Sequence, residues 1–298
     1  MSRISYKRRG EWLELMPGKA VKGAPDPLAA ASQWLQSSLA FPPKLLQQLH
    51  EAGGIRLAGD RLRLRMFLPR EPGFAAISDP PLVLYEDDFC LVVHKPAGCK
   101  VHPDGEERKP TLAHAVAAHY AASGEQAAVR HIHRLDEYTS GPVLYAKNEF
   151  AQLKLDSAMA RKEIHRVYIA IAQGEMKLGR MTIDAPIGRD RHHPKRRRVS
   201  PTGKPAVTHL ECLEVLRGAS LVRLQLETGR THQIRVHMSH IGHPLLGDEL
   251  YGGDPKRIRY QALHGEALEF VHPLTGEFIS VNDPWPPVIC ELHDQLKR

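Results

Sequence analysis

Residues 133–141 read His-Arg-Leu-Asp-Glu-Tyr-Thr-Ser-Gly, and they carry the groups of this chain that are best suited to chemistry. Asp136 follows Arg134 by two positions, and Gly141 permits a tight turn. A guanidinium within about 4–6 Å lowers a carboxyl pKa by about 1–3 units, which would keep Asp136 ionised for nucleophilic attack. On spacing alone, the pattern favours an Asp that accepts hydrogen bonds in a turn and pairs with Arg134 at the surface.

Two further side chains, Tyr168 and Arg235, could act together with such a carboxylate. Tyr168 lies in the apolar run 167–172, so its hydroxyl could transfer a proton, although the pattern alone favours a core aromatic. Arg235 precedes His237 by two positions, and alternation along a strand would place both on one face. A guanidinium can grip a carboxylate with two hydrogen bonds, whereas a surface salt bridge would contribute only ~0–1 kcal/mol.

The densest basic run of the chain lies at residues 189–198. It lacks the apolar periodicity of a core element, so we expect a flexible cationic loop. Such a loop could follow a phosphate backbone, and the alternative is a mobile, solvated loop. The candidate phosphate-binding residues are Arg189, Arg191, Lys195, Arg196, Arg197 and Arg198.

The elements that must position these residues follow a mixed order over residues 82–298. Strand-like runs at 82–85, 89–93, 167–172, 221–226, 267–271 and 278–281 are interrupted by helical segments at 111–122 and 148–161. There is no regular alternation of strand and helix. We therefore predict an α/β (α+β) fold with a mixed, largely antiparallel central sheet and flanking helices.

The N-terminal part has a different organisation. Residues 1–27 are polar and interrupted by Gly and Pro, which predicts an irregular arm. Residues 28–70 predict two short helices and a strand, and residues 71–81 predict a linker. In that strand Arg61, Arg63 and Arg65 alternate with apolar residues and form a candidate RNA-binding face. The order is similar to a small RNA-binding module of the S4 type, and the alternative is an amphipathic cap on the main domain.

Composition indicates a soluble protein with an anionic partner. The net charge of +7 and the pI near 9.2 favour binding of phosphate groups. The four cysteines lie far apart and lack Cys-x-x-Cys spacing, which indicates a reducing compartment. No stretch is apolar and long enough for a signal core or a membrane span. We expect a cytoplasmic monomer that does not enter a membrane.

Residues 133–141 closely match the pattern His-Arg-Leu-Asp-x-x-Thr-Ser-Gly and resemble the catalytic loop of the RluA-type pseudouridine synthases, which isomerise uridine within RNA. The resemblance extends in the family's order over residues 82–284. The other matching segments are residues 92–98, 101–103, 166–170, 203–208, 228–237, 242–252, 263–264 and 272–276.

The resemblance implies roles for individual residues. Asp136 would be the catalytic nucleophile, Tyr168 the active-site tyrosine and Arg235 the arginine that pairs with the aspartate. Arg134 would fill the gap left by a flipped nucleotide. The implied supporting residues are His133, Thr139, Gly141 and His232.

The resemblance also implies RNA, either ribosomal or transfer RNA, as the partner, with neither cofactor nor metal. The chain has 18 histidines, and His131, His133 and Asp136 have the spacing of a hydrolase metal cluster. We interpret these histidines as hydrogen-bonding supports, because the family motifs already account for the other candidate ligands. Two rival hypotheses are an inactive RNA-binding protein with the same fold and a metal-dependent hydrolase.

Overall fold

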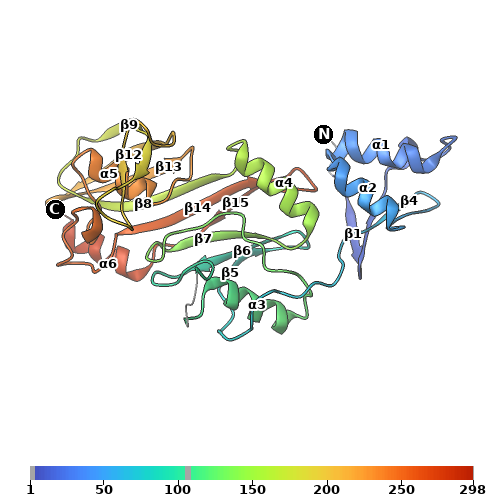
Figure 1. Ribbon diagram of the computed structural model, residues 1–298, viewed down its shortest axis with the longest axis horizontal. Coiled ribbons are helices and arrows are strands. Elements are labelled where there is room, and N and C mark those ends of the chain that lie inside the picture. Colours follow the sequence, from blue (N-terminus) through green and yellow to red (C-terminus); the bar gives the residue numbers. More distant parts are fainter. Residues whose placement is uncertain (1–3, 105–108, 298) are drawn as a thin grey trace.

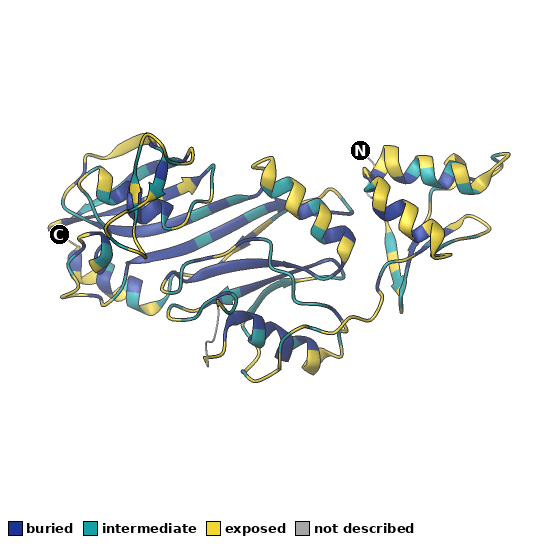
Figure 2. Ribbon diagram, viewed as in Figure 1, coloured by how far each residue is buried: buried dark blue, intermediate teal, exposed yellow. Residues whose placement is uncertain are grey.

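The computed structural model describes residues 4–104 and 109–297, and a six-stranded antiparallel sheet forms its centre (Figure 1). The central strand β8 is apolar on both faces because Tyr168 and Ala170 face one core and Ile169 and Ile171 face another. Figure 2 shows the buried residues running along this strand and its neighbour β14. The strands, in order across the sheet, are β15 (Phe278–Asn282), β14 (Leu263–Val271), β8 (His165–Gln173), β13 (Ala219–Leu226), β12 (Val207–Leu216) and β9 (Gly179–Asp184).

A three-stranded antiparallel sheet continues the main body and has a helix on each face. In its middle strand, Leu91 and Val93 pack with α3, whereas Cys90 and Val92 pack with α4. Asn148 caps α4 by accepting a hydrogen bond from the backbone of Ala151. The elements are β5 (Val83–Glu86), β6 (Cys90–Lys95), β7 (Gly141–Ala146), α3 (Leu112–Ser123) and α4 (Glu149–Ala160).

The two sheets meet where β7 lies beside β14 (Figure 1). The backbone N–H of Gly265 donates to Ser140 O at 2.8 Å, in a bridge that joins the end of residues 133–141 to the large sheet. Gly141 has φ +137°, and a Cβ there would lie 2.7 Å from the Cα of Gly265. Glycine is therefore required for the close approach of the two sheets.

Smaller elements complete the main body. Helix α6 packs Ile289, Leu292 and Leu296 against the Ile169 side of the large sheet. The basic run is not a loop throughout, because its two ends pair as an antiparallel hairpin. The remaining elements are β10 (Ile187–Arg189), β11 (Arg197–Val199), α5 (Gln233–His240), η2 (Glu249–Tyr251) and α6 (Pro287–Leu296).

The N-terminal module is a four-stranded antiparallel sheet with two helices on one face (Figure 1). Leu62 and Leu64 face these helices, while Arg61, Arg63 and Arg65 are on the other face. Asp26 caps the first helix by accepting two backbone hydrogen bonds. The elements are β1 (Tyr6–Arg9), β2 (Trp12–Leu15), η1 (Gly18–Ala20), α1 (Pro27–Leu39), α2 (Pro43–Glu51), β3 (Ile55–Ala58) and β4 (Arg61–Arg65).

The expectation of an irregular arm over residues 1–27 is wrong for residues 6–15. These residues form a hairpin, because Gly10 at φ +57° lets the chain reverse between β1 and β2. Leu13 and Leu15 are fully buried and lie opposite Leu64 and Leu62 of β4. The hairpin thus supplies two of the four strands of the module's sheet. Its many polar residues hid the alternation of apolar and polar side chains that predicts a strand.

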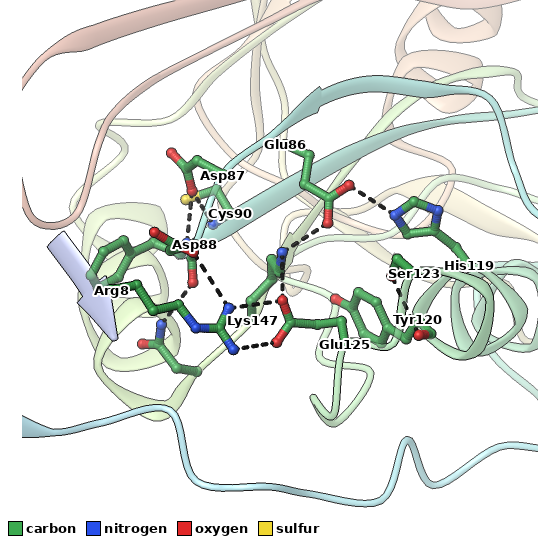
Figure 3. A network of polar contacts seen from close by, with 12 residues as sticks. Arg8, Glu86, Asp87, Asp88, Cys90, His119, Tyr120, Ser123, Glu125 and Lys147 are labelled. Atoms are coloured by element: carbon green, nitrogen blue, oxygen red, sulfur yellow. Dashed lines mark hydrogen bonds and ion pairs between the residues drawn. The ribbon is translucent and has the colours of Figure 1, made fainter. Parts of the chain in front are cut away.

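Arg8 of this hairpin fastens the module to the main body. Figure 3 shows its guanidinium pointing into a group of acidic residues, where it donates to Glu125 at 2.8 and 2.9 Å and to Asp88 at 3.4 Å. The hydrogen bonds from Arg8 lower the pKa of Glu125 to about 2. Apolar contacts adjoin the polar ones, since the rings of Phe41 and Phe150 stack at 4.7 Å.

The predicted fold class is confirmed. All pairings within the sheets of the described residues are antiparallel, and the parallel contact between Ser140 and His264 is an isolated bridge. None of the helices in residues 4–104 and 109–297 is both long and apolar enough to span a membrane.

Candidate active site

The segment that carries Asp136 is a tight turn between the two sheets. The backbone N–H of Thr139 donates to Asp136 O at 3.1 Å, which closes the turn. Thr139 is buried, and its hydroxyl accepts a hydrogen bond from Gln261 at 3.2 Å. The Asp136 side chain remains 27% exposed, so it can reach a ligand in the adjoining cleft.

A buried lysine holds the residue next to Asp136. Lys95 is fully buried, and its ammonium donates to Pro96 O, Cys99 O and Glu137 O at 3.1, 2.6 and 2.8 Å. Burial lowers the pKa of Lys95 to about 8. Three backbone carbonyls satisfy the three donors of the ammonium group, so this lysine fixes the backbone at the turn that carries Asp136.

Arg235 is the cation that faces Asp136. Its Nη1 atom lies 3.4 Å from Asp136 Oδ2, while Nε and Nη2 donate to the two carboxylate oxygens of Asp248 at 2.7 and 2.8 Å. Asp248 is buried, so this two-point contact fixes the plane of the guanidinium. The ring of Tyr251 lies under the guanidinium at 4.9 Å. Arg235, and not the exposed Arg134, is therefore the partner of Asp136.

The expectation that Arg235 and His237 share one face of a strand is wrong. Both residues belong to helix α5, which follows His232 in the left-handed conformation at φ +59°. The side chain of His237 contacts Thr208 and Ala185 at 2.9 Å, away from Asp136. Apolar and polar residues alternate over residues 233–238, which favoured a strand, but these residues are buried on all sides and carry no usable helical period.

Tyr168 lies on β8 and lines the same cleft as Asp136. It is 4% exposed, and burial raises the pKa of its hydroxyl, which therefore stays protonated at neutral pH. The core-aromatic interpretation is correct for most of the ring, because the ring packs in a core cluster with Ala170 and Leu224. The part of the side chain that reaches the cleft is available for chemistry.

The predicted supporting histidines occupy different places. Burial lowers the pKa of His133 to about 3, and its Nε2 accepts the backbone N–H of Leu144 at 3.3 Å. His232 Nδ1 lies 2.8 Å from the Tyr251 hydroxyl, which also accepts the backbone N–H of Arg197 at 3.0 Å. His232 and Tyr251 thereby connect the basic hairpin to helix α5.

The cleft beside Asp136 has a volume of about 950 Å³. Eight Lys and Arg side chains line it, against four carboxylates, which gives it a positive character suited to RNA. Lys195 and Arg197 of the predicted basic run line the cleft. Arg134, from the turn that carries Asp136, also lines it and is exposed. Arg189, Arg191, Arg196 and Arg198 are exposed and do not line it.

The arginines of β4 do not belong to this cleft. Arg63 binds Glu14 at 2.9 Å, and the guanidinium of Arg61 lies 3.8 Å from the same carboxylate. Arg65 pairs with Glu11 at 2.6 Å. Each of the three arginine side chains remains at least 38% exposed.

Three potential metal ligands, Asp87, Cys90 and His272, lie within 4.8 Å of one another outside the cleft. The ring of His272 accepts backbone N–H groups of Leu274 and Thr275 at Nδ1, so Nε2 carries its proton towards Asp87 at 2.9 Å. Internal hydrogen bonds account for this arrangement. Among the described residues, His131, His133 and Asp136 do not form such a group of potential ligands, and His133 Nε2 accepts a backbone N–H instead.

A family model described as RNA pseudouridylate synthase matches residues 89–240, which include Asp136, Tyr168 and Arg235. The chain belongs to this family. It is of the RluA type, and it is an RNA uridine isomerase. Relatives with which it shares 37–48% identity are named as pseudouridine synthases.

Two relatives and one solved structure indicate how far the similarity extends. The chain is 48% identical over 206 residues to the Uncharacterized RNA pseudouridine synthase YhcT of Bacillus subtilis, which covers 68% of both chains. It is 40% identical over 257 residues to Ribosomal large subunit pseudouridine synthase D of Haemophilus influenzae, covering 81% of this chain and 78% of that one. Human RNA Pseudouridylate Synthase Domain Containing 1 matches with a TM-score of 0.60 at 27% identity, over 72% of this chain and 88% of that chain.

Sequence reasoning missed several residues of this pseudouridine synthase site. Asp248 and Tyr251 lie in the segment 242–252, which had been matched to the family without a role for either residue. Lys95 lies in the matched segment 92–98, also without a role, because a lysine between a strand and a proline looks like an exposed residue. Arg166 is also buried at the cleft.

Proposed function

We propose that this protein isomerises specific uridines in structured ribosomal or transfer RNA to pseudouridine, with Asp136 as the nucleophile. The observation that carries the proposal is the partly exposed Asp136 carboxylate, which lies 3.4 Å from an arginine that buried Asp248 holds in place. A nucleophilic carboxylate must be ionised and accessible, and Arg235 favours the ionised form.

In this mechanism the target uridine leaves the base stack and enters the cleft beside Asp136 and Tyr168. Asp136 forms a bond to the nucleotide, the bond between N1 and the ribose breaks, and the base rotates and rejoins the ribose through C5. The bond to Asp136 breaks in turn, which returns the free carboxylate. The proton on C5 must then leave. Tyr168 lines the cleft that holds Asp136, and we assign it a role in that transfer.

Extruding a base costs a few kcal/mol, so contacts with the RNA backbone must offset it. We assign these contacts to the basic hairpin, with Lys195 and Arg197 at the cleft and the exposed Arg189, Arg191, Arg196 and Arg198 outside it. Arg134 is exposed at the same cleft and can occupy the space that the flipped nucleotide vacates.

We infer that the N-terminal module, now including β1 and β2, is a second RNA-binding surface of the S4 type. Its exposed face carries Arg61, Arg63 and Arg65, and Arg56 lies over the ring of Trp12 at 4.5 Å. Two glutamates pair with some of these cations, which leaves the face positively charged. Residues 71–81 would connect this module to the catalytic domain.

We further infer a cytoplasmic monomer that needs neither metal nor cofactor. The four cysteines are free thiols, which suits a reducing compartment. Activity that withstands a chelator would separate this proposal from a metal-dependent hydrolase.

The test is release of tritium from ribosomal and transfer RNA transcripts labelled at C5 of uridine. We expect the wild type to release tritium from one of these RNA classes. Asp136→Asn should lower the rate by about a thousandfold or more, because the amide is a poor nucleophile. Asp156→Asn is the matched control, since Asp156 lies on the exposed side of α4 and away from the cleft.

Two outcomes would contradict the proposal. If the Asp136→Asn variant retained the wild-type rate, Asp136 would not be the nucleophile. If the folded wild type released no tritium from either RNA class, the assignment of substrate would be wrong.

A further inference from the structure

Arg166 is a buried cation at the cleft beside Asp136, and no other residue that the structure describes is its partner. It lies two positions before Tyr168 on β8, is 9% exposed and lines the same cleft. Within residues 4–104 and 109–297 it makes no hydrogen bond or ion pair, and its Nε atom is buried with no partner.

Such a group is costly to fold, because a buried charge without compensation loses its hydration and gains nothing in return. The other buried cations near the catalytic turn are compensated. Lys95 donates to three carbonyls, and Arg235 contacts two carboxylates. A buried guanidinium without a partner among the described residues indicates that its partner comes from a bound ligand.

A second unpartnered donor lines the same cleft. Because the backbone N–H of Leu144 donates to His133 Nε2, the proton of the neutral ring is on Nδ1. That Nδ1 atom is buried and has no hydrogen-bond partner. Burial lowers the pKa of His133, and the charge of Arg166 lowers it further, while both residues line the same cleft. Two residues that line the cleft therefore each carry a buried donor that has no acceptor among the residues described.

The Arg166 guanidinium packs against Gly229, which has no side chain to occupy the same space. A Cβ at position 229 would lie 2.9 Å from Nη1 of Arg166, so any larger residue would displace the guanidinium. Gly229 itself lines the cleft. The substitution Gly229→Ala therefore offers a way to move the charge of Arg166 without removing it.

We propose that Arg166 binds a phosphodiester group of the RNA inside the catalytic cleft. The charge complementarity of a phosphate and a lone guanidinium supports this partner, and the adjacent His133 Nδ1–H adds a neutral donor. The inference rests on the proposed function, because it takes RNA as the occupant of the cleft. It assigns a buried contact in addition to the exposed basic hairpin.

The test measures binding of the RNA that the wild type modifies, over a range of KCl concentrations, in an Asp136→Asn background that prevents turnover. We expect Arg166→Gln to weaken binding about ten- to a hundredfold, as loss of a charged hydrogen bond does. The slope of log K against log salt should shrink by about 0.7–0.9, the value for one phosphate contact. Arg166→Lys, which keeps the charge, should restore most of the slope.

Arg223→Gln is the matched control, because Arg223 lies on the neighbouring strand β13, is exposed and pairs with Glu266 away from the cleft. It should change neither affinity nor slope. Thermal unfolding separates a structural role from a binding role. Arg166→Gln should melt no lower than the wild type, since it breaks no ion pair.

Gly229→Ala should weaken binding in the presence of Arg166 and have little further effect on Arg166→Gln. Reduced affinity with an unchanged salt slope would overturn the phosphate assignment in favour of a contact with a base or ribose. Unchanged affinity in Arg166→Gln would overturn the site itself. The proposed function fails separately, through the absence of tritium release by the wild type.

Discussion

At the scale of single residues, Asp136, Tyr168 and Arg235 were predicted together from sequence, and the structure brings them to one cleft. The three residues could be predicted together because each lies in a motif whose order along the chain could be read. Sequence motifs alone could not assign roles to Asp248 and Lys95. Their importance arises from burial against Arg235 and against the catalytic turn, and burial of a charged residue is visible only in three dimensions.

Lys95 leads to a prediction about pH. Its pKa falls from the ordinary 10.5 to about 8 on folding because of burial. Below about pH 8 the buried ammonium is charged in the folded state, and this charge lowers the free energy of unfolding. Between about pH 8 and 10.5 unfolding takes up a proton, so stability rises with pH in this window. Relative to Lys95→Met, the wild type should gain roughly 3 kcal/mol of unfolding free energy from pH 8 to 10.5.

Urea unfolding of both proteins across this pH range measures the difference. The Lys95→Met variant lacks the titrating group, so effects of other groups cancel in the comparison. A constant difference over the window would show that Lys95 stays charged in the folded protein. At neutral pH we also expect lower activity from this variant, because the Glu137 carbonyl loses its ammonium donor.

At the scale of elements, the antiparallel sheets and the helices on them followed from hydrophobic patterns. Helix α5 did not, because residues 233–238 are buried on every side and their pattern has no period that distinguishes a helix from a strand. The hairpin β1–β2 was missed for the opposite reason, since only Leu13 and Leu15 mark its buried face among polar residues. The junction of β7 with β14 depends on backbone contact, which no side-chain pattern records.

Substitution of Gly141 tests this junction. Gly141→Ala should destabilise the protein by roughly 3 kcal/mol or more, because it combines a positive φ with a Cβ 2.7 Å from the Gly265 backbone. Gly124→Ala is the control: its φ is +72° with open space around it, so it should cost only about 1 kcal/mol. Chemical denaturation gives both values. Equal losses in the two variants would mean that the junction can relax.

At the scale of the whole molecule, Arg8 joins the N-terminal module to the catalytic body through Glu125 and Asp88 (Figure 3). The stacked rings of Phe41 and Phe150 add an apolar contact between the same two parts. The two candidate RNA-binding surfaces are thereby held in a fixed relation. A long structured RNA could contact both at once, which raises affinity without any new contact in the cleft.

Arg8→Met should loosen this attachment while each part stays folded. We expect faster cleavage by chymotrypsin at Phe74, in the segment that connects the two parts, and weaker binding of structured RNA. Arg9→Met is the control, because Arg9 interacts with Glu14 inside the module. If both variants were cleaved at the wild-type rate, the Phe41 and Phe150 contact would be sufficient to hold the module.

The bridge between Ser140 and His264 has a consequence for how the enzyme matures. Asp136 and Arg235 are 99 positions apart, and the turn that presents Asp136 is anchored on β14, near the end of the chain. Contacts between distant positions form late because closing long loops is slow. The proposed catalytic pair of Asp136 and Arg235 can therefore assemble only after both sheets have joined. Recovery of activity during refolding would report that the whole main body has folded.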